Sequence, residues 1–161
     1  MDEQKVYEVL DSLGIEYEVM HHEAVFTIEE ARQKGMKFPA QLCKNLFLRN
    51  ANGKIHYLLI VDENKQTDLK ALARQIGSSR LSFGSDERLY TQLKLTAGSV
   101  GPFGLINNTD KSVVALVDSG LSACEKICFH PNVNTATVTL RYGDFEKYLQ
   151  WTGNKIGYVQ I

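Results

Sequence analysis

The chain has 161 residues, of which 43% are hydrophobic and 23% are charged, a composition typical of one soluble globular domain with a sizeable core. The net charge of -1 excludes an overall basic field for nucleic acid, although a local patch could still bind RNA. No apolar run approaches the ~20 residues of a membrane span, and residues 1–5 are too polar and acidic for a signal peptide. Three cysteines do not suggest a disulfide framework, so we expect a cytoplasmic protein.

The first residues predict a helix followed by a strand. Apolar side chains recur at helical spacing over residues 6–13, and a glycine follows as the C-cap. Residues 15–19 then alternate between apolar and acidic side chains, as in a strand with one buried face. His21 and His22 end this strand, and we expect both imidazoles to be solvated.

A capping box begins the second helix. Thr27 can accept a hydrogen bond from the N–H of Glu30, and Glu30 can reach back to the N–H of Thr27. We therefore expect a short helix that runs to about residue 34 and stops at Gly35.

The next predicted strand, residues 42–49, contains a lysine in an apolar setting. Side chains alternate between the faces of a strand, so Lys44 shares a face with three leucines, while Asn45 lies on the other face. In one interpretation the strand end is exposed and Lys44 extends its ammonium into water. In the other, the ammonium enters a cleft as a fixed positive charge.

The middle of the chain predicts a hairpin and two capped helices. An Asn-Gly turn at residues 50–53 leads into residues 55–61, which are apolar on both faces and so belong in the centre of the sheet. Asp68 and Ser85 each precede a helical apolar pattern and act as N-caps.

A glycine-rich loop follows the second of these helices. Gly98, Gly101 and Gly104 are spaced three apart, with Ser99 and Pro102 between them. Glycine allows close approach and proline stiffens the chain, so the backbone N–H groups could bind an anionic or carbonyl oxygen. The alternative is a tight connection without a ligand.

The spacing of this loop excludes two phosphate-binding motifs. A dinucleotide fingerprint needs G-x-G-x-x-G at the start of a helix, and a P-loop ends in Gly-Lys-Ser/Thr. Here the spacing is G-x-x-G-x-x-G, and we expect residues 105–110 to form an apolar step and a polar turn instead of a helix.

The last third of the chain predicts three strands, a helix and a tail, at residues 113–117, 127–130, 135–140, 145–151 and 157–161. The third strand alternates threonine with apolar residues, which indicates an edge position with a hydroxyl face, and Asp144 is expected to cap the helix. The whole pattern predicts one α+β domain with mixed or mostly antiparallel strands.

Two cysteines and a histidine around the second of these strands could form a metal site or a Cys/His nucleophilic pair. Cys124, Cys128 and His130 lack the second close ligand pair that structural zinc requires, so we expect no metal and buried, free cysteines. His130 ends its strand next to a proline and a polar run, where sites collect. A hydrogen-bonded structural histidine is the alternative.

A set of motifs in this order resembles the YbaK and proline-tRNA-synthetase-associated editing domain family. The motifs are Thr27-Ile28-Glu29-Glu30-Ala31, Cys43-Lys44-Asn45-Leu46-Phe47, Asp68-Leu69-Lys70, residues 98–104, Val117-Asp118, and Phe129-His130-Pro131 leading to Asn134-Thr135. The chain is most similar to the freestanding members of the family, which deacylate alanyl-tRNA(Pro).

The resemblance implies a mixed, barrel-like sheet with surrounding helices over residues 1–161, and hydrolysis of the ester on a mischarged proline tRNA without metal, cofactor or covalent intermediate. It implies a key polar role for Lys44, with the glycine loop (Gly98, Ser99, Gly101 and Pro102), Asn45 and His130 lining the site. Thr27 and a small pocket of Met20, Phe26 and Ile28 are expected to complete substrate binding.

The resemblance also implies binding partners, and two alternative functions remain open. The expected partner is the acceptor end of proline tRNA carrying a non-cognate amino acid, with prolyl-tRNA synthetase or an elongation factor as transient partners and no membrane. One rival is a deacylase of cysteinyl-tRNA(Pro). The other is a non-catalytic tRNA-binding or regulatory module.

Overall fold

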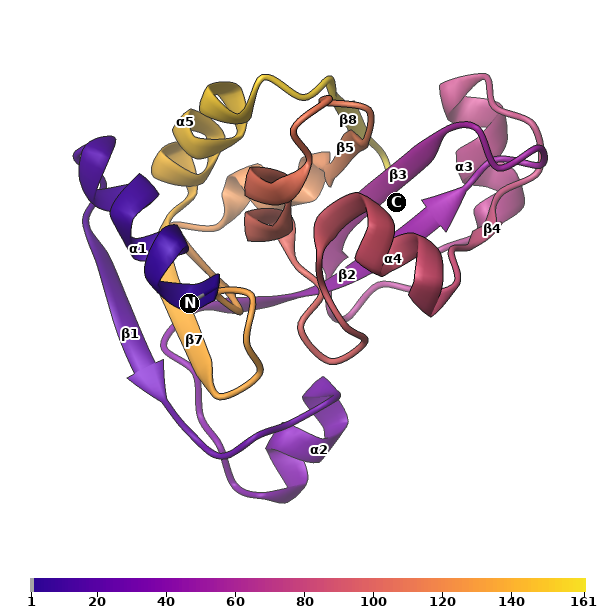
Figure 1. Ribbon diagram of the computed structural model, residues 1–161. Helices are drawn as coiled ribbons and strands as arrows, with labels where there is room; N and C mark the ends of the chain where they lie inside the picture. Colours follow the sequence, from indigo (N-terminus) through magenta and orange to yellow (C-terminus); the bar gives the residue numbers. More distant parts are fainter. Residues whose placement is uncertain (1) are drawn as a thin grey trace.

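A mixed sheet organises the fold of the computed structural model, which describes residues 2–161 (Figure 1). The elements are, in chain order, α1 (Asp2–Ser12), β1 (Tyr17–His21), α2 (Ile28–Gln33), β2 (Gln41–Arg49), β3 (His56–Asp62), α3 (Leu69–Ile76), β4 (Ser82–Phe83), α4 (Asp86–Leu93), the 3-10 helix η1 (Pro102–Asn107), β5 (Val114–Asp118), the 3-10 helix η2 (Ser119–Ala123), β6 (Lys126–Phe129), β7 (Ala136–Arg141), α5 (Tyr142–Thr152) and β8 (Ile156–Val159).

The eight strands form one sheet in the order β1-β7-β6-β2-β3-β5-β8, and the short β4 pairs with β2. The β1–β7, β7–β6, β2–β3 and β2–β4 pairs are antiparallel, whereas β2–β6, β3–β5 and β5–β8 are parallel. This mixed sheet with helices around it confirms the predicted α+β class.

One edge of β2 is only partly paired, and this positions the site. β3 follows one edge of β2 from Cys43 to Arg49. On the other edge, β6 pairs only with Gln41 and Leu42, and β4 pairs only with Leu48 and Arg49. The stretch of β2 between these two partners therefore faces a gap in the sheet.

The core lies on both faces of β3, which confirms its predicted central position. Leu58 and Ile60 belong to the larger apolar cluster, and Leu59 and Val61 belong to a second cluster with α3. All four side chains are fully buried. Alternation along one strand thus joins two apolar layers.

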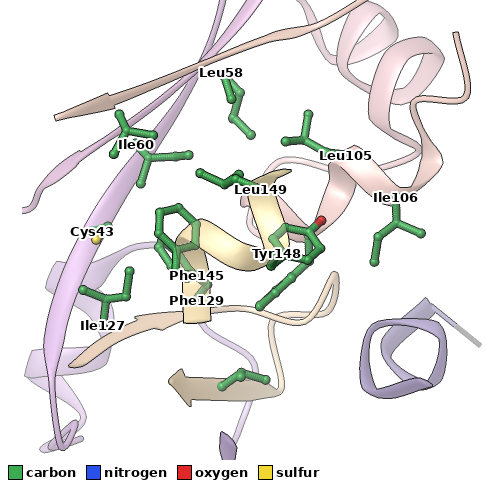
Figure 2. Close-up of a cluster of buried hydrophobic side chains, with 14 of the residues drawn as sticks. Cys43, Leu58, Ile60, Leu105, Ile106, Ile127, Phe129, Phe145, Tyr148 and Leu149 are labelled. Atoms are coloured by element: carbon green, nitrogen blue, oxygen red, sulfur yellow. The ribbon is translucent and has the colours of Figure 1, made fainter. Parts of the chain in front are cut away.

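Helix α5 fills the larger core. Figure 2 shows Phe145, Tyr148 and Leu149 of α5 among side chains from β2, β3, β6 and η1. The hydroxyl of the buried Tyr148 donates to the carbonyl of Pro102 at 2.8 Å. This hydrogen bond ties α5 to Pro102, which belongs to the glycine loop and begins η1.

The structure corrects two expectations in the last third of the chain. Strand β7 is not an edge strand, because it pairs with both β1 and β6, and its threonine hydroxyls are buried. Helix α5 begins at Tyr142 and not near residue 145, and its N-cap Arg141 makes no side-chain capping bond. Asp144 therefore lies inside the first turn, where its carboxylate interacts favourably with the positive end of the helix dipole.

Helix capping follows the sequence with one difference. The side chains of Thr27, Asp68 and Ser85 accept N–H groups of α2, α3 and α4, as predicted. However, Glu30 accepts the N–H of Phe26 at 3.1 Å and does not reach back to Thr27. The carboxylate of Glu30 thereby fixes the segment that precedes α2.

Residues 102–107 form the 3-10 helix η1, which contradicts the expectation of no helix after the glycine loop. Pro102 opens this helix, and the N–H of Gly104 donates to the carbonyl of Gly101 at 3.1 Å. A 3-10 helix has 3.0 residues per turn and is used in short pieces, so it does not show the extended 3.6-residue apolar period by which the sequence reveals an α-helix.

Candidate active site

A cavity of about 610 Å³ opens at the unpaired stretch of β2. Most of its lining comes from four stretches of the chain: residues 25–29, 31 and 32 on and before α2, residues 42–46 of β2, residues 97, 98 and 100 of the glycine loop, and residues 128–130 at the end of β6. This volume lies within the ~300–1,000 Å³ range of small-molecule sites, so the cavity can hold an aminoacyl group or a nucleoside.

Lys44 lies in the cavity wall, which favours the cleft interpretation over an exposed strand end. Its Nζ donates a hydrogen bond to the carbonyl of Lys65, in the loop after β3. Among residues 2–161 no carboxylate lies within ion-pair distance of Lys44, whereas Lys65 pairs with Asp118 at 3.0 Å. The cavity therefore contains a positive charge that a neutral carbonyl holds in place without neutralising it.

Asn45 adds an unsatisfied polar atom to the same wall. Its Oδ1 is buried and has no hydrogen-bond partner among the described residues. Leaving a buried acceptor unpaired costs ~1–3 kcal/mol, so such an atom is a natural ligand contact. Asn45 reaches the cavity from the second face of β2 because no strand covers this edge.

His130 is held as a neutral acceptor. Its Nδ1 donates to the carbonyl of Ala136 at 2.8 Å, which leaves Nε2 free to accept a hydrogen bond. Burial lowers the pKa of His130 below the ordinary value of 6.5, and nearby His22 lowers it further. The ring therefore stays neutral near pH 7.

His22 is not the solvated residue that the sequence suggested. Its Nδ1 lies 2.8 Å from the carbonyl of Glu23, and its Nε2 lies 2.8 Å from the hydroxyl of Thr137. Its ring centroid is 5.9 Å from that of His130. His22 thus supports the His130 side of the cavity.

The glycine loop contributes to the cavity through Gly98 and Val100. Gly98 has a φ of 71°, and a Cβ placed on it would lie 2.6 Å from Cδ1 of Phe26. Both the backbone angle and the close aromatic ring require glycine at this position. Phe26 itself is 67% exposed and lies at the cavity wall.

Fewer backbone N–H groups of the glycine loop are free than the sequence predicted. The N–H of Ser99 donates to the carbonyl of Thr96 at 3.0 Å, and its side chain is buried outside the cavity wall. The N–H groups of Val100 and Gly101 have no protein acceptor within residues 2–161. Ser99 therefore cannot supply the oxyanion contact, because its N–H is already used.

The structure brings together seven of the predicted site residues and leaves four outside the cavity wall. Those in the wall are Phe26, Thr27, Ile28, Lys44, Asn45, Gly98 and His130. Ser99, Gly101 and Pro102 lie in the adjoining loop, and Pro102 is buried. Met20 lines a separate hollow with Lys37 and Phe38 instead, because its strand β1 is separated from β2 by both β7 and β6.

Sequence reasoning missed Glu63, Arg32, Phe38 and Thr137, which also line the cavity. Glu63 follows β3 at the point where the hairpin register brings it beside Leu42, since the N–H of Glu63 donates to the carbonyl of Leu42 at 3.2 Å. Counting outward from the turn at residues 50–53 could have located Glu63 beside the Lys44 strand.

The cysteines are poorly suited to act as nucleophiles. Burial raises the pKa of Cys43, of Cys128 and of Cys124, so the thiol form persists at neutral pH. Cys128 contacts the hydroxyl of Thr139 at 3.2 Å. Within the described chain, no three His, Cys, Asp or Glu side chains are grouped to hold a metal ion.

Comparison with known families matches residues 22–148 to the aminoacyl-tRNA editing domain. The chain belongs to this family. The match includes α2, β2, the glycine loop and His130, which form the cavity. It confirms the family that the motifs indicated and, with it, the class of activity, aminoacyl-tRNA editing.

Individual relatives agree with this assignment. The chain is 41% identical over 158 residues to the prolyl-tRNA editing protein ProX of Acetoanaerobium sticklandii, which covers 98% of this chain and 96% of that protein. It is 34% identical over 149 residues to prolyl-tRNA synthetase associated domain-containing protein 1 of Bos taurus, covering 90% of this chain and 86% of the relative.

A solved structure confirms the fold. The structure of a candidate trans-editing enzyme for prolyl-tRNA synthetase matches with a TM-score of 0.73 at 20% identity, and it covers 99% of this chain and 97% of that one. Because the match covers 99% of the chain, the fold is consistent with the family assignment.

Proposed function

We propose that this editing-domain protein hydrolyses the ester between a mischarged amino acid, alanine first of all, and the terminal adenosine of proline tRNA. The observation that carries the proposal is the un-neutralised ammonium of Lys44 in a cavity that a small aminoacyl group can enter. The relative named prolyl-tRNA editing protein supports proline tRNA as the substrate.

A separate editing enzyme is needed because the amino-acid pocket of a tRNA synthetase has limited selectivity. A synthetase pocket built for proline cannot strongly reject a smaller amino acid, because each missing methylene changes binding by only ~1–3 kcal/mol. A second, small cavity then hydrolyses what the first pocket accepts in error. The aliphatic wall here, with Val25, Ile28, Ala31 and Leu42, suits a small apolar side chain.

Lys44 is the electrostatic centre of the proposed reaction. Attack on an ester carbonyl places negative charge on its oxygen, and a fixed ammonium in a partly closed cavity stabilises that charge. The free N–H groups of Val100, which lines the cavity, and of the next residue, Gly101, are the remaining oxyanion donors. The nucleophile is a water molecule, and its proton passes, through the neighbouring ribose hydroxyl or a second water molecule, to the ribose oxygen that leaves as the ester bond breaks.

Asn45 and His130 are proposed to position the terminal nucleoside. Asn45 has an unpaired Oδ1, and His130, which also lines the cavity, has a free Nε2 acceptor. Ribose hydroxyl and adenine amino groups are donors that both acceptors can bind. Phe26, exposed at the cavity wall, offers a face on which the adenine can stack, a contact typically worth ~1–3 kcal/mol.

The proposed partner is the acceptor end of proline tRNA, with prolyl-tRNA synthetase or an elongation factor as transient partners. Such a role places the protein in the cytoplasm, where tRNAs are aminoacylated. The helices over residues 2–161 are all too short or too polar to cross a membrane.

The experiment is a deacylation assay on alanyl-, cysteinyl- and prolyl-tRNA(Pro), performed in the presence of chelator. We expect rapid release of alanine and slow release of proline. Faster release of cysteine than of alanine would assign the protein to cysteinyl-tRNA(Pro). If no amino acid is released from any of the three, the proposed hydrolysis is wrong and a binding module takes its place.

A further inference from the structure

Glu63 is a buried acidic residue in the cavity that the reaction described above does not use. Its side chain is only 10% exposed. One carboxylate oxygen, Oε1, accepts a hydrogen bond from the guanidinium of Arg32 on α2. The other oxygen, Oε2, is buried and has no partner among the described residues.

Glu63 lies in the turn directly after β3, and the β2–β3 pairing brings it beside the strand that carries Lys44. Lys44 is opposite Val61 in the β2–β3 pair, and Glu63 follows Val61 by two residues. The N–H of Glu63 donates to the carbonyl of Leu42 at 3.2 Å, so the pairing with β2 continues one residue past the end of β3. Lys44 and Glu63 both line the cavity, which therefore contains an ammonium and a carboxylate.

These two opposite charges do not neutralise each other. Lys44 donates to the carbonyl of Lys65, and the cation next to Glu63 is Arg32. Arg32 is 54% exposed and contacts only one of the two carboxylate oxygens. The second oxygen keeps its full capacity to accept hydrogen bonds.

A buried, charged and unpaired acceptor calls for a positively charged donor from the ligand. An aminoacyl ester carries one such group, the α-ammonium, on the carbon next to the ester carbonyl. The phosphates and hydroxyls of the tRNA end offer no cation. The charges of the substrate thus match those of Lys44 and Glu63: its phosphates and developing oxyanion can face Lys44, and its α-ammonium can face Glu63.

We propose that Glu63 binds the α-ammonium of the aminoacyl ester and restricts the enzyme to substrates with a free amino group. This inference rests on the proposed editing function and extends it to the substrate class. N-acylated esters, such as N-acetylalanyl- or peptidyl-tRNA, lack the ammonium and leave Oε2 unpaired. With Lys44, Glu63 sets the direction in which the ester lies in the cavity.

The ion pair with Arg32 also has a structural consequence, which the test must separate from binding of the ammonium. Arg32 belongs to α2, which forms one wall of the cavity, so Glu63 also fastens this helix to β3. Glu63→Gln removes the negative charge but keeps an acceptor oxygen for Arg32. Arg32→Met breaks the ion pair but keeps the charge of Glu63.

The experiment compares kcat/KM for alanyl-tRNA(Pro) and N-acetylalanyl-tRNA(Pro) in the wild-type protein and its variants. We expect the wild type to prefer the free amine. Glu63→Gln should lower kcat/KM for alanyl-tRNA(Pro) by about 10-fold or more, as expected for loss of a charged hydrogen bond. The rate on the N-acetyl substrate should remain the same, so that the preference largely disappears.

Two control variants complete the test. Arg32→Met should retain the preference for the free amine, even if both rates fall. Glu23→Gln removes an exposed carboxylate outside the cavity wall and should leave the preference unchanged, which controls for the general effect of charge on tRNA binding. The inference is overturned if Glu63→Gln lowers both rates equally, or if Arg32→Met abolishes the preference as Glu63→Gln does.

A binding measurement keeps this inference separate from the proposed hydrolysis. The probe is 3′-alanylamido-adenosine, a non-hydrolysable analogue, used with and without an N-acetyl group. If the wild type hydrolyses no aminoacyl-tRNA, the proposed reaction fails, but weaker binding of the free-amine analogue to Glu63→Gln would still support the ammonium contact. Equal binding of both analogues to the wild type would reject it.

Discussion

At the scale of single residues, the environment of a group decides its chemistry more than its type does. Lys44 and Lys65 lie close together, yet Lys65 is neutralised by Asp118 and Lys44 is held only by a carbonyl oxygen. The same contrast separates the glycines of the loop. Gly98 has left-handed backbone angles, whereas Gly101 is extended, with φ −176° and ψ 172°.

The two glycines should therefore respond differently to alanine. Gly98→Ala should destabilise the protein by ~1–3 kcal/mol, because alanine resists a positive φ and its Cβ would collide with Phe26. Displacement of Phe26 should also raise KM for the charged tRNA. Urea unfolding and steady-state kinetics measure the two effects.

Gly101→Ala is the matched comparison for this prediction. An added Cβ there would meet only the carbonyl of His130 at 3.6 Å, an ordinary contact, and the backbone N–H is retained. We expect a change in unfolding free energy within ~0.5 kcal/mol. Equal destabilisation by both alanine variants would contradict the backbone argument.

At the scale of elements, the cavity depends on helix α5 although α5 does not line it. The Tyr148 hydroxyl donates to the Pro102 carbonyl from within the core, and burial raises the pKa of Tyr148, so the hydroxyl keeps its proton. Through this bond α5 holds the start of η1 and, with it, the end of the glycine loop.

Removal of this hydroxyl by Tyr148→Phe should cost ~1–3 kcal/mol of unfolding free energy, because the buried Pro102 carbonyl loses the hydrogen bond that Tyr148 donates. Tyr158→Phe is the control: its hydroxyl contacts Glu146 at 2.9 Å from an exposed side chain, so the loss should stay below ~0.5 kcal/mol. Chemical unfolding of the two variants measures the difference. A Tyr148→Phe protein as stable as Tyr158→Phe would show that α5 does not anchor the loop.

At the scale of the whole molecule, local sequence signals predicted the elements but not how distant elements meet. The caps at Asp68 and Ser85 and the central position of β3 are confirmed, since each depends on neighbouring residues. The edge position predicted for β7 is wrong, because alternating threonines also occur where hydroxyls find partners such as His22 and Cys128.

The site was likewise predictable only where neighbouring residues in the sequence reveal it. Lys44 on an apolar face is a local conflict that the sequence displays, and the structure places it in the cavity wall. Glu63 carries no such conflict, and only the hairpin register brings it near Lys44. Met20 was misplaced because the strand order, which separates β1 from β2, depends on pairing between distant segments.

Stability should depend on pH through two buried histidines. Burial lowers the pKa of both His56 and His130 below 6.5, and Arg88 also lowers that of His56. Between the lowered values and 6.5 the unfolded chain binds protons that the folded chain does not, so stability is lost as the pH falls through this window. Urea unfolding between pH 7.5 and pH 5 should show this decline.

Substitution of each histidine tests whether His56 and His130 cause the loss of stability at low pH. His56→Gln and His130→Gln should each make the unfolding free energy less dependent on pH below 6.5, because one proton-linked group is removed. The account is wrong on this point if the wild-type protein becomes more stable on acidification. An unchanged pH dependence in both variants would move the effect to other groups.

The measurement that tests the central claim most directly is single-turnover release of alanine from alanyl-tRNA(Pro) by Lys44→Ala beside Lys54→Ala. Lys54 is an exposed lysine at the turn of the same hairpin, so both variants lose one positive charge from one supersecondary unit. We predict that Lys44→Ala slows release by at least ~100-fold, the usual effect of losing an oxyanion contact, while Lys54→Ala keeps the wild-type rate. A folded Lys44→Ala protein that releases alanine as fast as Lys54→Ala would contradict the assignment of this cavity as the active site.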